Sequence, residues 1–513
     1  MSEWNGEVSG VGAVRVIGAL LVAAAAGCGH APPNGNGART PAGAVASTPA
    51  AASPARGRWL LHGSLTASVG VDGVAASYLA TWFGAEHVGR TVSLPGAYYV
   101  SFSPDGKWLT LCIPDPEGAT PHAIRRASVL RLDGESISEP LVVGECGELE
   151  WAPTGARLLL RSDDRDWRLV ELGGSEPLVR ELGARFQSPI SWSPNGRYFV
   201  APGRDETQDL LLVSVLERGR PAQVLDGFAE SRRACHWSST DGFACVVVRQ
   251  GKEQLVIAHV SDVSLAPHVV EPSLPVKWFG WATDRALVYE HERDGGVYVL
   301  GADLASMRLF EPAASAGYYS STMSPRGGWL LDCAGEGARL WDLASAPRRV
   351  PLPGLPARLV NPRWSPDGKH ALLGVPHRAA SLQQDDVWLV ADASREPRLA
   401  RVAKLAPERQ SYARFSPASG WVLVSVSTDV PTLAAAARAS DPDPAASHFA
   451  VHVATLAERP LPFGSAAWAA DDSAFVTADD ARLLGFRVRG TTIIGPEDLG
   501  RLGAPGTTPI WQP

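Results

Sequence analysis

Acidic residues recur at one position of a short phrase that is repeated along this chain of 513 residues. Asp105, Asp241 and Asp367 each stand directly before a glycine, and carboxylates of this kind can bind calcium or act as acid and base in hydrolysis. The phrase places each aspartate in a separate copy of one turn, where Asp tolerates the tight backbone geometry. We therefore interpret these carboxylates as turn residues and predict no catalytic residue.

The histidines offer one candidate metal site. Of the 12 histidines, His448 and His452 are the closest pair, and Asp441 and Asp443 lie just upstream. The sequence contains no His-Glu-x-x-His helix motif, no Cys-x-x-Cys pair and no Gly-x-Ser-x-Gly elbow of a serine hydrolase. We predict neither a metal nor another cofactor, and we expect the chain not to be an enzyme.

The six cysteines divide into one near the N-terminus and five in the body of the chain. Cys235 and Cys245 flank one predicted hairpin, and Cys112 and Cys146 lie in adjoining repeat units, so both pairs are candidate disulfides. Since five is an odd number, at least one thiol stays free in an oxidising compartment. With both candidate bridges formed, Cys333 is that thiol.

The N-terminal segment has the character of an export signal. Residues 16–26 form an apolar run behind Arg15 that is too short to span a bilayer as a helix, which predicts a signal peptide over residues 1–27. The end of this run and the two residues after it, Ala25-Ala26-Gly27-Cys28, resemble the lipobox of bacterial lipoproteins, although Ala25 stands where that family usually has Leu. The resemblance implies a diacylated Cys28, and Gly29 after it implies the outer membrane.

Residues 28–52 are rich in Ala, Pro, Gly, Ser and Thr and contain no large apolar side chain. Such a segment cannot bury enough apolar surface to offset the entropy of ordering, so we expect a flexible tether. Residues 53–513 then form the folded body.

One phrase recurs through this body: an aromatic anchor residue, a Ser-Pro-x-Gly-like turn, and an apolar strand. The anchors stand 41 to 53 residues apart, which is close to the roughly 40–45 residues of a four-stranded propeller blade. Proline presets the turn and glycine supplies a positive φ, so each phrase predicts a hairpin. The anchors, including weaker copies of the phrase, are Phe102, Trp151, Trp192, Trp237, Trp281, Met323, Trp364, Phe415 and Trp468.

The two ends of the body complement each other. Residues 53–59 supply a turn and strand without a preceding strand, whereas residues 509–513 supply an anchor strand without a following turn. Together they predict one blade built from both ends of the chain, which closes a ring of sheets and removes exposed strand edges.

These phrases resemble the WD40-like repeats of TolB-type β-propellers, over about residues 53–513. The resemblance implies an all-β fold and partners in the cell envelope. Nine units plus the split one give ten, against the usual four to eight blades. We predict a single β-propeller of eight to ten four-stranded blades, with two smaller propellers as the alternative.

Charge and composition narrow the function classes. The net charge is −7 without a long basic run, which argues against a nucleic-acid binder. We predict a non-enzymatic, lipid-anchored envelope propeller that binds proteins, facing the periplasm or the cell surface. The alternative is a propeller enzyme acting on glycan in the central channel.

Three long links between strands are candidate functional loops on one face of the propeller: residues 113–127, 376–385 and 427–447.

Overall fold

The computed structural model describes residues 58–511 except for links between strands, the longest of which are 115–124, 311–319, 428–446 and 502–509. The predicted signal peptide, the tether and Cys28 lie outside the described residues. All the regular secondary structure of the described residues is β-strand. None of these residues forms a helix that is long and apolar enough to cross a membrane.

The described strands form ten antiparallel units, each built around four strands, which we number as blades 1–10. Blade 1 comprises β41 (Ile510–Trp511), β1 (Arg58–Gly70), β2 (Gly73–Phe83) and β3 (Val88–Ala97). Blade 2 comprises β4 (Tyr99–Phe102), β5 (Trp108–Pro114), β6 (Arg125–Asp133) and β8 (Leu141–Glu145), with the short β7 (Ser136–Ile137) beside β6. Blade 3 comprises β9 (Glu148–Trp151), β10 (Arg157–Arg161), β11 (Arg168–Glu171) and β12 (Leu178–Glu181).

The next blades repeat this order from the innermost to the outermost strand. Blade 4 comprises β13 (Ser191–Trp192), β14 (Tyr198–Pro202), β15 (Asp209–Ser214) and β16 (Gln223–Ser231). Blade 5 comprises β17 (His236–Trp237), β18 (Gly242–Arg249), β19 (Lys252–His259) and β20 (His268–Val269). Blade 6 comprises β21 (Val276–Thr283), β22 (Ala286–His291), β23 (Val297–Leu300) and β24 (Ser306–Phe310).

Four more blades complete the ring. Blade 7 comprises β25 (Ser320–Met323), β26 (Trp329–Ala334), β27 (Gly337–Asp342) and β28 (Arg348–Val350). Blade 8 comprises β29 (Val360–Trp364), β30 (Ala371–Pro376), β31 (Gln384–Ala391) and β32 (Arg398–Lys404). Blade 9 comprises β33 (Gln410–Phe415), β34 (Trp421–Ser427), β35 (Ser447–His452) and β36 (Glu458–Leu461). Blade 10 comprises β37 (Ala466–Trp468), β38 (Ala474–Asp479), β39 (Arg482–Arg489) and β40 (Thr492–Arg501).

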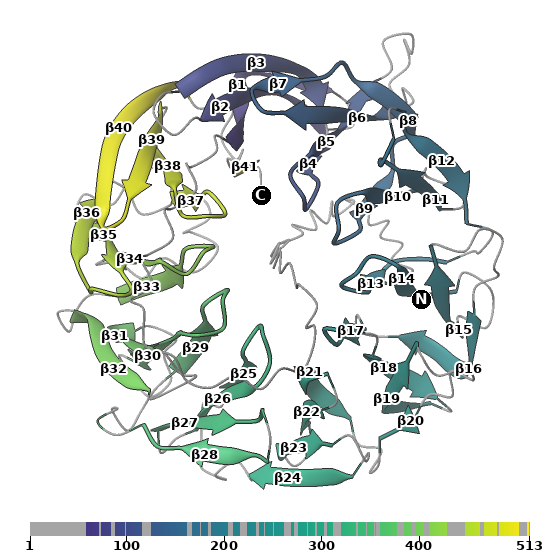
Figure 1. Cartoon of the computed structure of the whole chain (residues 1–513), viewed down its shortest axis with the longest axis vertical. Helices are drawn as coiled ribbons and strands as arrows, with labels where there is room; N and C mark the ends of the chain where they lie inside the picture. Colours follow the sequence, from purple (N-terminus) through teal and green to yellow (C-terminus); the bar gives the residue numbers. More distant parts are fainter. Residues whose placement is uncertain are drawn as a thin grey trace, which may run out of the picture.

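The blades stand side by side around one central axis, with β4, β9 and their equivalents innermost (Figure 1). The predicted all-β propeller is therefore confirmed, and the sheets form a single ring rather than two smaller ones. Each anchor residue lies in the innermost strand of its blade, as the repeat phrase predicts.

Blade 1 contains strands from both ends of the described chain. Leu60 and Leu61 of β1 pair with Trp511 and Ile510 of β41, so the last strand becomes the innermost strand of the first blade. Blades 4 and 5 share one continuous sheet, because β16 pairs with β18 through Ala229 and Val248. These two blades are thus joined by backbone hydrogen bonds as well as by side chains.

The hydrophobic core is divided among the interfaces between blades. Trp59 and Leu61 of blade 1 pack with Leu109 and Leu111 of blade 2, and all four are almost fully buried. Because the second and third strands of a blade are covered on both faces, they read as nearly continuous apolar runs. Burial of each such side chain contributes about 1.5–3 kcal/mol, so the ring is held together mainly at these interfaces.

Candidate functional site

The turn that joins the innermost strand of a blade to the next strand, here called the inner turn, is locked by its own side chains. In blade 2, Ser103 Oγ donates to Asp105 Oδ1 at 2.6 Å, and Lys107 N donates to the same oxygen at 3.1 Å. Ser103 Oγ also accepts a hydrogen bond from Trp108 N at 2.9 Å. Blades 4 and 8 repeat these contacts through Ser193, Asn195, Arg197 and Tyr198, and through Ser365, Asp367, Lys369 and His370.

These contacts show what the recurring aspartates do. Burial alone raises the pKa of the Asp367 carboxyl, but hydrogen bonds from Ser365 Oγ and Lys369 N outweigh this, and the pKa lies below its ordinary value. The carboxylates of Asp105 and Asp367 are therefore engaged in their own turns, in agreement with the structural role predicted from the sequence. Asp241 lies outside the described residues.

Neighbouring inner turns pack against one another around the ring. Gly155 has φ +74°, and a Cβ atom built on it would lie 2.4 Å from the Asp105 carboxylate of the preceding blade. A Cβ atom on Gly368 would likewise lie 2.5 Å from Ser324 Oγ. Glycine is required here both for the left-handed backbone and for the close approach of the next turn.

The inner turn of blade 9 lacks an acidic residue and receives one from blade 10. Asp472 Oδ2 accepts from Ser416 Oγ at 2.5 Å and from Gly420 N at 2.9 Å, and its Oδ1 accepts from Ala418 N at 3.0 Å. Asp472 is buried, and this burial raises the pKa of its carboxyl even though three donors stabilise the charged form. One carboxylate therefore ties two successive turns together.

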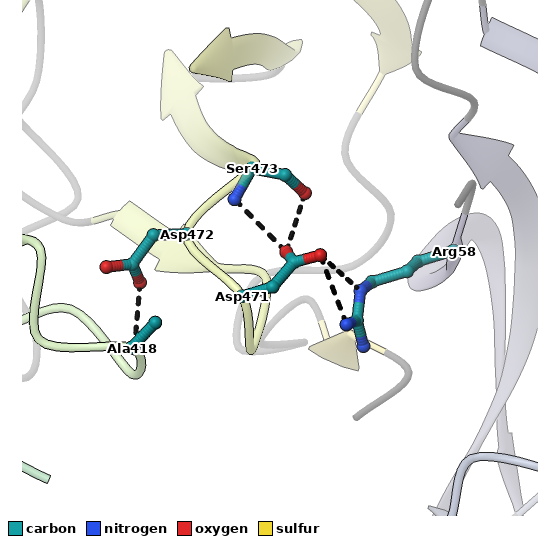
Figure 2. A network of polar contacts seen from close by, with 5 residues as sticks. All are labelled: Arg58, Ala418, Asp471, Asp472 and Ser473. Carbon is teal, nitrogen blue, oxygen red and sulfur yellow. Dashed lines mark hydrogen bonds and ion pairs between the residues drawn. The ribbon is translucent and has the colours of Figure 1, made fainter. Parts of the chain in front are cut away.

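The adjacent residue, Asp471, contacts blade 1, which follows blade 10 where the two ends of the chain meet (Figure 2). Asp471 Oδ2 lies 3.2 Å from Arg58 Nη2 in β1, and Asp471 Oδ1 accepts hydrogen bonds from Ser473 N and Ser473 Oγ. Burial would raise the pKa of Asp471, but these hydrogen bonds and the nearby guanidinium hold it below its ordinary value. The pair Asp471 and Asp472 thus connects blade 10 to both of its neighbours.

Below the turns, tryptophan anchors bond to the preceding blade. Trp237 Nε1 donates to the backbone oxygen of Ser191 at 2.9 Å, and Trp281 Nε1 donates to that of His236 at 2.9 Å. Trp364 Nε1 makes the equivalent bond to Thr322 O at 3.0 Å. By contrast, the indole nitrogens of Trp151, Trp192 and Trp468 are buried without a hydrogen-bond partner in the described structure.

Side chains just before the anchors reach forward to the next blade. Ser191 Oγ donates to the backbone oxygen of Cys235, and Arg363 Nη1 donates to that of Ala413 at 3.4 Å. Arg414 Nη2 donates in the same way to the oxygen of Ala466. The polar groups of the innermost strands are thus used largely to fasten one blade to the next.

Glu150 occupies this same position, directly before the anchor Trp151, in blade 3. Burial, with a smaller contribution from the charge of Glu148, raises the pKa of Glu150 to about 7. Glu148 itself pairs with Arg161 at 2.5 Å and accepts from Ser188 Oγ at 2.7 Å. Nothing in the sequence phrase distinguished Glu150, because its environment depends on packing between blades.

The tips of the inner turns remain exposed around one mouth of the ring. Lys107, Arg197 and Lys369 occupy the same turn position in blades 2, 4 and 8, and their side chains are exposed while their backbone nitrogens hold the turn. Exposed prolines stand three residues before this position, at Pro153, Pro194, Pro325, Pro366 and Pro417. We call this surface the turn face; its backbone is held by the hydrogen bonds described above, and its exposed side chains are of mixed polarity.

The structure joins both candidate cysteine pairs. Cys112 in β5 is bonded to Cys146, with Cα atoms 5.7 Å apart, and Cys235 is bonded to Cys245 in β18, with Cα atoms 4.4 Å apart. Cys333 in β26 is free and buried, and this burial raises the pKa of its thiol. A buried neutral thiol is unreactive, so Cys333 is a core residue.

The described residues contain no group of three or more His, Cys, Asp or Glu that could hold a metal ion. His452 Nδ1 lies 3.0 Å from Thr455 Oγ1, and burial lowers the pKa of His452. Asp441 and Asp443, and most of the three long links, lie outside the described part of the chain.

No protein-family model and no curated protein matches this chain. Among solved structures, it is similar to a eukaryotic initiation factor, with a TM-score of 0.49 and 12% identity over 89% of this chain and 98% of the other. The C-terminal WD40 domain of Sif2 gives a TM-score of 0.33 and 15% identity over 65% and 93% of the two chains. The tricorn protease gives 0.32 and 11% over 87% and 48%.

Proposed function

We propose that this protein is a non-enzymatic β-propeller of the bacterial cell envelope, held to the membrane by lipid on Cys28, that binds a partner protein through the turn face. The observation that carries this proposal is the construction of that face. Buried serines and acceptors such as Asp105 fix the inner turns, while the side chains of Lys107, Arg197 and Lys369 remain exposed. A rigid scaffold with exposed tips loses little entropy when it binds another protein.

The predicted export signal and the resemblance of the repeats to those of TolB-type propellers support the proposed location in the cell envelope. Residues 16–26 and Cys28 have the pattern of a lipoprotein signal, and the repeats resemble those of an envelope protein family. The disulfides Cys112–Cys146 and Cys235–Cys245 suit an oxidising compartment outside the cytoplasm. The partners we propose are envelope proteins.

The experiment is capture of bound proteins from detergent-solubilised native membranes, comparing the wild type with the variant Lys107→Glu, Arg197→Glu, Lys369→Glu. Since these residues hold the turns through backbone atoms and not through their side chains, the variant should fold normally and lose its partner. The matched control carries Lys252→Glu, Arg349→Glu and Arg489→Glu, which are exposed residues away from the inner turns with the same total charge change. The control should retain the partner.

Mass spectrometry of the N-terminal peptide tests the anchor in the same sample, and a diacylated Cys28 is the expected result. Equal capture by the wild type and both variants would show that the turn face is not the binding surface. Recovery of bound glycan in place of a protein partner would refute the binding proposal and favour the enzyme alternative, whose site would lie in the channel.

A further inference from the structure

The junction between blades 3 and 4 differs from equivalent junctions in one side chain. In blades 4, 8 and 9 the residue directly before the anchor donates a hydrogen bond to a backbone oxygen of the next blade. In blade 3 the residue at this position is Glu150. A carboxyl group can donate a hydrogen bond there only while it carries a proton.

The acceptor at these junctions has a fixed place in the sequence. In all three, the oxygen belongs to the residue two positions before the next anchor. The donor and acceptor pairs are Ser191 with Cys235, Arg363 with Ala413, and Arg414 with Ala466. For Glu150 the corresponding acceptor is the backbone oxygen of Ile190, two positions before Trp192.

A contact between the same two segments supports this alignment. Ser188 Oγ of blade 4 donates to Glu148 Oε2 of β9 at 2.7 Å. Glu148 stands two residues before Glu150, and Ser188 stands two residues before Ile190. Side chains two residues apart point to the same side of a strand. Since β9 and β13 are the innermost strands of neighbouring blades (Figure 1), the next contact after Glu148 and Ser188 is that of Glu150 with Ile190.

The pairing within blade 3 also places Glu150 on the side that faces blade 4. Glu150 of β9 lies opposite Leu159 of β10, and residues directly opposite in a ladder share one face of the sheet. Leu159 is fully buried in a core cluster with Phe186, Trp192 and Phe199 of blade 4. All described side chains that blade 4 contributes to this cluster are apolar. None of them offers a charge to the Glu150 carboxylate.

The charged groups on the same face of blade 3 are paired with one another. They are Glu148 with Arg161 at 2.5 Å, and Glu171 with Arg157 at 3.5 Å and with Arg180 at 3.6 Å. Burial, with a smaller contribution from the charge of Glu148, raises the pKa of Glu150 to about 7. Glu150 therefore gains and loses its proton near neutral pH.

A second bond found at other junctions is absent from this one. Three tryptophan anchors of other blades donate to the backbone of the preceding blade, whereas Trp192 Nε1 is buried without a hydrogen-bond partner in the described structure. The contact of Ser188 with Glu148 remains, as does a hydrogen bond from Arg157 Nη1 to Gly196 O at 3.1 Å. A bond from Glu150 would thus be one of few polar contacts that join these two innermost strands.

We propose that Glu150 is a proton-controlled latch between blades 3 and 4. With its proton, the Glu150 carboxyl donates a hydrogen bond to the backbone oxygen of Ile190. Loss of that proton to solvent leaves only acceptors at the contact, and the two innermost strands loosen locally while the other contacts keep the ring closed. Because β13 leads directly into the inner turn of blade 4, the loosening extends to the turn face. The latch depends neither on the proposed partner nor on the lipid anchor.

The test is hydrogen exchange of the full protein read by mass spectrometry at about pH 5.5 and about pH 8.5, on either side of the Glu150 titration. Rates are corrected for the intrinsic pH dependence of amide exchange. In the wild type, residues 186–192 should exchange about fivefold faster at the higher pH, as expected for one lost hydrogen bond. The internal control is β33, whose Ala413 oxygen is held in the equivalent way by Arg363 and which should not respond to pH.

Two variants of similar size separate the hydrogen bond from the charge. Glu150→Gln donates from its amide at every pH, so residues 186–192 should exchange slowly at both pH values. Glu150→Met has neither donor nor charge, so the same residues should exchange fast at both. The proposal is overturned if residues 186–192 of the wild type respond to pH no more than β33 does, or if the response persists in Glu150→Gln. Slow exchange in Glu150→Met would also overturn it, because the buried charge and not the lost bond would then loosen the junction.

Discussion

The Asp472 carboxylate lies in the inner turn of blade 10 and accepts a hydrogen bond at 2.5 Å from Ser416 Oγ in the inner turn of blade 9. In blades 2, 4 and 8 the equivalent serine bonds to an Asp or Asn two residues further along its own turn. Blade 9 has Ala418 at that place, and the acceptor comes from the next blade instead. The two turns are therefore a single hydrogen-bonded unit.

Replacing Asp472 with alanine should destabilise the protein by about 2–4 kcal/mol, because Ser416 Oγ and two backbone donors lose their acceptor in a buried place. Asp472→Asn should lose less, since Asn tolerates the residue's φ of +59° and keeps one oxygen acceptor. Urea unfolding of the three proteins measures the difference. Equal stability of all three would show that the shared turn contributes nothing.

Gly155→Ala should destabilise the protein strongly, because the added methyl would collide with Asp105, which its own turn holds in place, in addition to straining the backbone. The control Gly251→Ala has the same φ of +74° but nothing within 4 Å of the new methyl. It should show only the backbone cost of about 1–2 kcal/mol. Thermal unfolding compares the two, and similar losses would contradict the packing of neighbouring turns.

Trp237→Phe should cost about 1 kcal/mol more than Trp192→Phe, since only Trp237 donates a hydrogen bond to the preceding blade. Trp192 Nε1 is buried without a partner in the described structure, so its removal relieves an unfavourable burial. Chemical unfolding of both variants tests this, and a larger loss for Trp192→Phe would overturn the assignment.

Glu150→Gln should stabilise the protein at pH 8 and leave it nearly unchanged at pH 4. The raised pKa of about 7 means that the folded state holds a proton which the unfolded state has released, so stability falls as pH rises from about 4.5 to about 7. The amide removes this penalty. Glu181→Gln, which makes the same change at an exposed position, is the control variant. A pH-independent effect of Glu150→Gln would refute the buried-carboxyl interpretation.

The sequence predicted the inner turns and the repeat of the blades because each depends on local chemistry: a serine, a proline and a glycine at fixed spacing between apolar runs. It could not predict that Asp472 serves the turn of blade 9, since that contact joins residues separated by 56 positions in the sequence. The same limit applies to Glu150.

Neither disulfide crosses the join at which β41 meets β1. Cys112–Cys146 connects β5 to the segment after β8, and Cys235–Cys245 closes a short loop around β17, so each crosslink stays close to one blade. Within the described residues, no covalent bond therefore joins the two ends of the chain where the ring closes. A reducing agent would remove crosslinks within individual blades but would not open the ring. Closure of the ring depends on the pairing of Leu60 and Leu61 with β41 and on the contact of Arg58 with Asp471.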